Sequence, residues 1–149
     1  MRTLLLAVAI ATASIATPAF ADQAPVHTAL LSRLAVGGYD PVAYFTDGRP
    51  VRGTVEHRIT HQGYEYRFAS AEHLAAFRAN PSRYLPQYGG YCAWAVSQGY
   101  TAAGNPNNWR IVDGRLYLNY NDEIQTRWER DIPGFIRSAN ANWPGVLSR

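Results

Sequence analysis

The only cysteine of the chain, Cys92, has the widest chemical repertoire of any side chain in it. It follows Gly89 and Gly90 and opens residues 92–98, a segment that predicts a short helix. Free N–H groups at a helix N-terminus favour a thiolate, so the position predicts a lowered pKa and a reactive sulfur that would be the catalytic residue of any thiol chemistry. The alternative is a buried, inert cysteine that packs as a small hydrophobic residue.

Histidines supply the other candidate ligands. His57 and His61 lie four positions apart on one predicted strand, so they share a face but are separated by about 13 Å along it. His73 lies early in a predicted helix. A metal site would need folding to bring Cys92 to His61 or His73, and a thiolate with an imidazole suits a soft transition metal such as copper or zinc. If no such metal site forms, we expect each histidine to be solvated or hydrogen-bonded.

The composition excludes several classes of protein. One cysteine excludes an internal disulfide, and thiol redox chemistry would then need a partner or a small thiol to resolve it. The motifs of serine hydrolases, P-loop nucleotide-binding proteins and zinc proteases are absent, which favours a binding module over an enzyme. All 14 basic residues are arginines, scattered singly, whereas a nucleic-acid-binding protein shows a basic patch. We therefore expect no nucleic-acid partner.

Residues 1–21 have the order of a secretory signal peptide. Arg2 gives the positive start, an apolar stretch follows, and residues 19–21 (Ala-Phe-Ala) fit the small-x-small cleavage rule. The apolar run is too short to span a membrane, and no later segment is apolar enough. We expect an exported protein, periplasmic or secreted according to the host, with no stable membrane insertion after the signal is removed.

The remaining chain predicts a small α+β domain, in which β-hairpins carry short helices packed against them. Residues 22–36 are expected to form a flexible leader. No internal repeat is evident in the sequence. The expected elements are strands at 55–61 and 64–68, a helix capped by Ser70, a hairpin of 109–112 and 115–119 turning at Asp113-Gly114, and a last helix capped by Asn121.

Two stretches resemble the YHS family. They are Tyr39-Asp40-Pro41-Val42-Ala43 and the pattern Tyr64-x-Tyr66-Arg67-Phe68-Ala69-Ser70-x-x-His73-Leu74-x-x-Phe77-x-x-Asn80-Pro81-x-x-Tyr84. The resemblance implies a YHS-like domain over residues 37–149, with the signature at 39–84 and a C-terminal extension at 85–149.

The family is regarded as binding heavy metals through cysteines, and this chain has Ala43, Ala69 and His73 at those positions. The extension, with Gly89-Gly90-Tyr91-Cys92-Ala93, is similar to an exported branch in which some members carry selenocysteine where Cys92 stands. The resemblance therefore supports redox or ligand chemistry at Cys92.

Three functions remain open from the sequence. The first is an exported binding module for copper or zinc through Cys92, with His73 or His61 as a further ligand. The second is a thiol redox protein that uses Cys92 with a small external thiol. The third is an interaction domain without chemistry, whose protein partner the sequence does not identify.

Cleavage between Ala21 and Asp22 is the first testable prediction. Intact-mass measurement of protein recovered from the native export route should give a chain that begins at Asp22, because residues 19–21 present small side chains to the peptidase. Recovery of a chain that retains residues 1–21 would contradict it.

Overall fold

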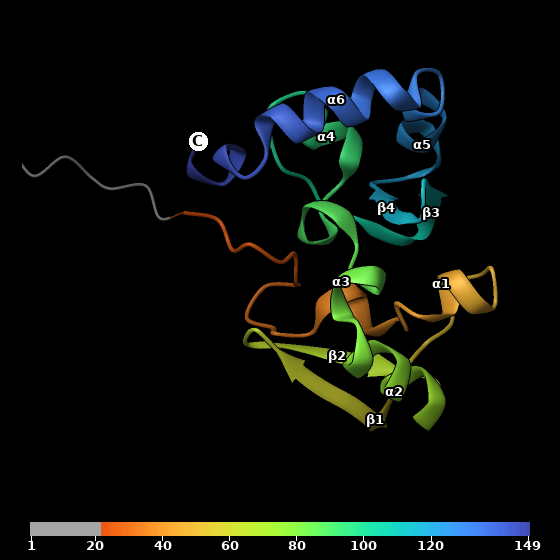
Figure 1. Cartoon of the computed structure of the whole chain (residues 1–149). Coiled ribbons are helices and arrows are strands. Elements are labelled where there is room, and N and C mark those ends of the chain that lie inside the picture. The colour runs from red at the N-terminus through yellow and green to blue at the C-terminus, as the bar shows by residue number, and fades with distance from the viewer. Residues whose placement is uncertain (1–21) are drawn as a thin grey trace, which may run out of the picture.

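The computed structural model describes residues 22–149 (Figure 1), so the predicted signal peptide lies outside the described part. The chain is an α+β fold of short helices and two antiparallel hairpins, as expected. Within residues 22–149 no helix is both long and apolar enough to cross a membrane. The elements in chain order are η1 (Ala35–Gly38), α1 (Ala43–Thr46), β1 (Thr54–His61), β2 (Tyr64–Phe68), α2 (Ala71–Ala79), α3 (Pro81–Tyr84), η2 (Gln87–Gly90), α4 (Ala93–Ser97), β3 (Asn105–Val112), β4 (Arg115–Asn119), α5 (Asp122–Trp128), α6 (Ile132–Asn142) and η3 (Gly145–Ser148).

Local sequence signals explain the hairpins and the helices that follow them. Asp113 and Gly114 both have positive φ at the β3–β4 turn, as a type I′ turn requires. Ser70 accepts a hydrogen bond from the His73 N–H at the start of α2. Asn121 accepts one from the Ile124 N–H at the start of α5. These expected turns and caps are confirmed.

The chain contains an internal structural repeat, which the sequence analysis did not detect. Thr54 pairs with Phe68 across β1–β2, and Asn105 pairs with Asn119 across β3–β4. The equivalent residues are 51 positions apart (105 − 54 = 51), and both hairpins have their irregularity directly after this first pair. Each hairpin leads into a capped helix. The two halves appear in Figure 1 as a lower unit with β1, β2 and α2 and an upper unit with β3, β4 and α5.

The loop that precedes each hairpin is repeated as well. Val36 and Gly37 have positive φ in η1, and Tyr88 and Gly89 have positive φ in η2. In each loop the following tyrosine N–H donates a 3.0 Å hydrogen bond back to the first of these residues.

The residues that follow the two loops also make equivalent backbone hydrogen bonds. The Asp40 N–H donates to the Val51 carbonyl at 2.8 Å, and the Cys92 N–H donates to the Ala102 carbonyl at 2.9 Å. Asp40 and Cys92 therefore occupy equivalent positions, 52 residues apart (92 − 40 = 52).

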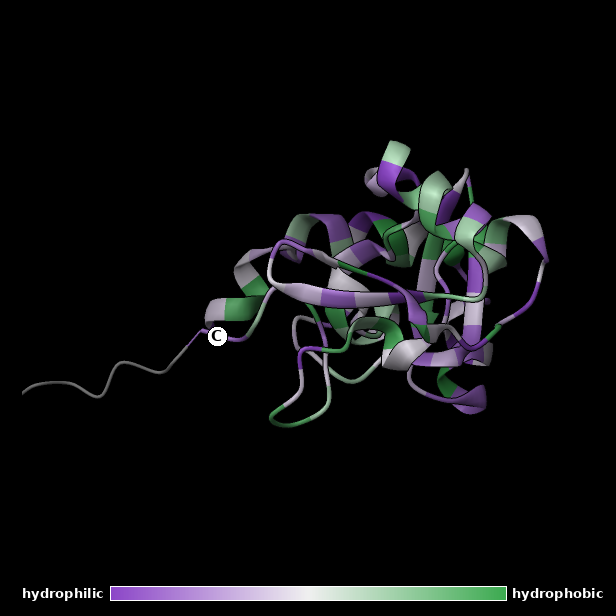
Figure 2. Ribbon diagram, turned by 90° about the horizontal axis from the view of Figure 1, so that it is seen from below, coloured by the Kyte–Doolittle hydropathy of each residue, from purple (hydrophilic) through white to green (hydrophobic). Residues whose placement is uncertain are grey.

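Two hydrophobic cores meet at strand β4. Leu116 and Leu118 belong to the core of the first half, whereas Tyr117 packs with Trp128 in the core of the second half. Successive strand residues face opposite sides, so β4 buries both faces and joins the halves. Figure 2 shows hydrophobic and polar residues interspersed along the ribbon.

Both ends of the described chain differ from expectation. The segment before η1 packs along the fold instead of forming a loose leader: the Gln23 N–H donates to the Leu147 carbonyl, and the His27 N–H donates to the Gly89 carbonyl. The helix capped by Asn121 is not the last one, because α6 (Ile132–Asn142) follows it. The Asp131 side chain caps α6 by accepting from the Gly134 N–H, and α6 contacts α4. Pro133 fits because the first helical turn needs no N–H donor there.

Equivalent glycines give a test of the repeat. Gly53 and Gly104 precede β1 and β3, and a Cβ at either would overlap backbone atoms, of Arg67 and Gly90 respectively. We expect Gly53→Ala and Gly104→Ala each to lower the free energy of unfolding by about 1–3 kcal/mol, measured by urea denaturation. Gly145→Ala is the control, because no atom lies within 4 Å of its added Cβ. Parent-like stability of both test variants would contradict the equivalence.

Candidate functional site

Asp40 forms the polar centre of the first half. Its side chain is fully buried. One oxygen accepts hydrogen bonds from the N–H groups of Val42 (2.8 Å) and Ala43 (3.2 Å). The other accepts from the Ala69 N–H at 2.9 Å. We call this set of three N–H groups the first cradle, and it satisfies the buried Asp40 carboxylate.

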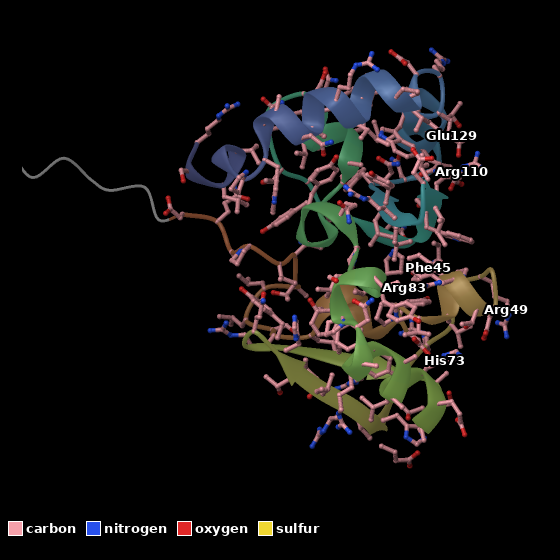
Figure 3. The ribbon with its side chains drawn as sticks, viewed as in Figure 1. Phe45, Arg49, His73, Arg83, Arg110 and Glu129 are labelled. Carbon is pink, nitrogen blue, oxygen red and sulfur yellow. The ribbon has the colours of Figure 1, made fainter. Side chains whose placement is uncertain are left out.

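His73 completes the first cradle. Its Nδ1 lies 2.5 Å from the same Asp40 oxygen, and its Nε2 lies 3.1 Å from Thr46 Oγ1 and 3.7 Å from an Asp47 oxygen. Figure 3 places His73 in the lower half of the molecule, between α1 and α2. Both ring nitrogens therefore have partners inside this half, which favours a positioning role over that of a free metal ligand.

Cys92 lies in a second cradle, built by the equivalent backbone groups. Backbone N–H groups of Trp94, Ala95 and Tyr120 lie near its sulfur and act to lower the pKa of the thiol. They lie 51 or 52 positions after Val42, Ala43 and Ala69, respectively, the groups that hold the Asp40 carboxylate. The sulfur thus occupies the place that a carboxylate takes in the first half.

The predicted lowering of the Cys92 pKa is wrong. Cys92 is 1% exposed, and this burial raises the pKa of its thiol, while the cradle N–H groups only partly offset the effect. The thiol also lies 3.5 Å from the Asn119 Oδ1 and donates to it, which favours the neutral form. In the resting protein Cys92 is therefore a buried thiol, the alternative that the sequence left open.

Asn119 connects the groups around Cys92 by hydrogen bonds. It is fully buried, and its Oδ1 also accepts the Trp94 N–H at 3.0 Å. Its Nδ2 donates to Gln125 Oε1 at 2.8 Å. Sequence reasoning missed Asn119, because a polar residue at a strand end reads as exposed. The repeated Gly-Gly-Tyr at 37–39 and 89–91 was the available signal that Asp40 and Cys92 are equivalent.

A cavity of about 340 Å³ opens beside Cys92. Tyr100 and Tyr120 are about half exposed and stand at its mouth. Its walls are mostly apolar, with Asn121 and Glu123 as the polar members beside Cys92. The full lining is Cys92, Trp94, Ala95, Tyr100, Ala102, Tyr120, Asn121, Glu123 and Ile124.

The metal-ligand pairs expected from the sequence, Cys92 with His61 or with His73, do not come together at this cavity. Neither His61 nor His73 lines it. His61 instead packs edge-on against Phe77 and lines a separate hollow of about 190 Å³ with Tyr64 and Tyr66. Across residues 22–149 no group of three or more His, Cys, Asp or Glu side chains is placed to hold a metal ion.

Thiol reactivity tests the environment of Cys92. We expect iodoacetamide to label the native protein slowly at pH 7, with a rate that rises through an inflection above about 8.5, the value for a free cysteine, because burial disfavours the thiolate. Labelling in denaturant gives the reference rate. An inflection below that of the unfolded chain would show that the cradle outweighs burial.

Comparison of the chain with protein-family models, with curated proteins and with solved structures finds no match.

Proposed function

We propose that this protein is a small exported binding module that takes one small, mainly apolar molecule into the cavity beside Cys92. The observation that carries the proposal is the cavity, whose volume of about 340 Å³ falls in the range of small-molecule sites. Aromatic and aliphatic walls with few polar groups favour a ring-shaped, largely uncharged ligand. Asn121, Glu123 and the Cys92 thiol are the groups that would orient it.

Copper or zinc binding has less support than this proposal. The sequence hypothesis required Cys92 to share a site with His61 or His73, and those histidines pack elsewhere among the described residues. The thiol redox alternative is weakened because burial disfavours the Cys92 thiolate. It is supported by the cavity, which gives a small molecule a path to the region of Cys92.

Membership of the YHS family remains a proposal. Its support is that three polar signature residues act together: the His73 ring hydrogen-bonds the Asp40 carboxylate, and Ser70 caps α2 by accepting from the His73 N–H. The signature residue Phe77 is fully buried in the first core.

Indole serves as a probe of the cavity. We expect indole to shift the backbone NMR signals of Trp94, Tyr120 and Ile124, and Ile124→Trp to weaken its binding at least about tenfold by filling the space, a loss of about 1.4 kcal/mol. Val55→Trp is the matched control, because Val55 is 54% exposed on β1 and does not line the cavity.

Two outcomes would overturn the proposal. One is indole shifts that are absent or lie elsewhere on the protein. The other is zinc or copper binding at one ion per chain that is lost in both Cys92→Ala and His73→Ala, which would restore the metal hypothesis.

A further inference from the structure

A second hollow lies where the turn of the β1–β2 hairpin meets the segment before η1. Its volume is about 190 Å³, and it shares no lining residue with the cavity beside Cys92. Figure 1 shows the segment before η1, in orange, running past the turn end of this hairpin. We call this space the hairpin hollow, and its chemistry differs from that of the cavity.

The hairpin places three polar side chains on one face. Residues 62 and 63 both have positive φ, as a two-residue type I′ turn requires, and His61 and Tyr64 are therefore cross-strand partners. Tyr66 lies two positions further along β2, so it faces the same side as Tyr64. The rings of His61 and Tyr66 contact each other edge-on, with centroids 6.2 Å apart. All three residues line the hairpin hollow.

Two tyrosine hydroxyls in this hollow have no protein partner. Tyr64 and Tyr66 are 7% and 3% exposed, yet among residues 22–149 neither hydroxyl makes a hydrogen bond. The other deeply buried tyrosines, Tyr44, Tyr88 and Tyr91, each donate to a protein oxygen at 2.7–2.8 Å. Neither free hydroxyl is sealed inside the core, so both reach the hollow that their rings line. Buried hydroxyls normally have a partner, and here a ligand can supply it.

The polar groups of the hollow favour an anion. Burial, with a smaller contribution from the nearby Tyr64, raises the pKa of Tyr66 to about 12, so its hydroxyl remains a donor at neutral pH. The His61 ring and the Gln62 amide add N–H donors. No acidic side chain of the described residues lines the hollow. The Arg33 guanidinium lies 5.5 Å from the centroid of the Tyr64 ring and adds positive charge nearby.

The remaining side chains of the lining are apolar. Val26 and Leu85 pack against the first core, and Pro25 and Pro86 stand beside them. These walls suit a short hydrocarbon group. The volume lies below the usual range of drug-sized sites, so the ligand must be small.

We propose that the hairpin hollow is a second binding site, which takes a small organic monocarboxylate. The carboxylate accepts hydrogen bonds from the Tyr64 and Tyr66 hydroxyls and from the His61 ring, and the hydrocarbon part packs against the apolar walls. The site is independent of the proposed function, because the two cavities have no residue in common.

Butyrate and its neutral isostere butyramide are the probes. We expect butyrate to shift the backbone NMR signals of Val26, Gln62 and Tyr64. Butyramide should bind at least about tenfold more weakly, because hydrogen bonds to a charged acceptor are the stronger ones. Three results would overturn the proposal: no butyrate shifts, shifts at Trp94 and Tyr120 instead, or equal affinity for the two probes.

Substitutions that keep the rings test the hydroxyls. Tyr64→Phe and Tyr66→Phe should each weaken butyrate binding about tenfold, because each removes one hydrogen bond to the carboxylate. Tyr84→Phe is the matched control, since Tyr84 packs against Phe45 and lines neither cavity. Parent-like affinity in both test variants would overturn the proposal.

A change at the exposed turn tests the charge without disturbing the core. Gln62→Glu places a negative charge at the edge of the hollow, at an exposed position. It should weaken butyrate binding several-fold and leave butyramide binding unchanged. An equal effect on both probes, or none on butyrate, would contradict the anion site.

The outcomes separate this inference from the proposed function. Butyrate shifts at the hairpin hollow without any indole binding would remove the binding function of the cavity beside Cys92 and keep the carboxylate site. Indole binding without butyrate shifts would do the opposite.

Discussion

The burial of Asp40 is the constraint from which the first half of the fold follows. A carboxylate with no exposed surface is stable only if its lone pairs are satisfied, because an unpaired buried polar group costs several kcal/mol. Asp40 meets this requirement with donors from three places: the start of α1, the residue after β2, and His73 on α2. The loop, the helices and the hairpin are thus fixed relative to one another by one side chain.

The second half keeps the same framework around a weaker acceptor. Cys92 offers a thiol where Asp40 offers two oxygens, and Asn119 makes up the difference by accepting both the thiol and the Trp94 N–H. Phe68, the residue equivalent to Asn119, is fully buried in the first core. An apolar side chain suffices there because Asp40 satisfies the N–H groups itself. The Asn119 amide and the Cys92 thiol are therefore linked by a hydrogen bond, and the presence of a buried amide in the second half follows from the presence of the thiol.

The sequence predicts the local structure of this protein better than its site. Asp113-Gly114, Ser70 and Asn121 act through contacts within a few residues, so their turns and caps could be predicted from the sequence. Helix α6 was missed although the Asp131 cap is local, because Pro133 and Gly134 in its first turn resemble a loop and its stability comes from packing against α4. The pKa of Cys92 was predicted in the wrong direction because burial, a tertiary property, outweighs the local N–H groups.

The two halves differ in the side chain that stands beside the buried group, His73 in the first half and Ile124 in the second. In the first half the imidazole of His73 bridges Asp40 and Thr46, and so closes the cradle with protein atoms. In the second half Ile124 can donate no hydrogen bond to the sulfur, and a thiol with a hydrogen-bonded amide beside it needs none. The space beside Cys92 is then left to solvent or to a ligand, bounded by Tyr100 and Tyr120 at its mouth. The same duplicated framework thus gives a closed structural centre in one half and an open, chemically distinct site in the other.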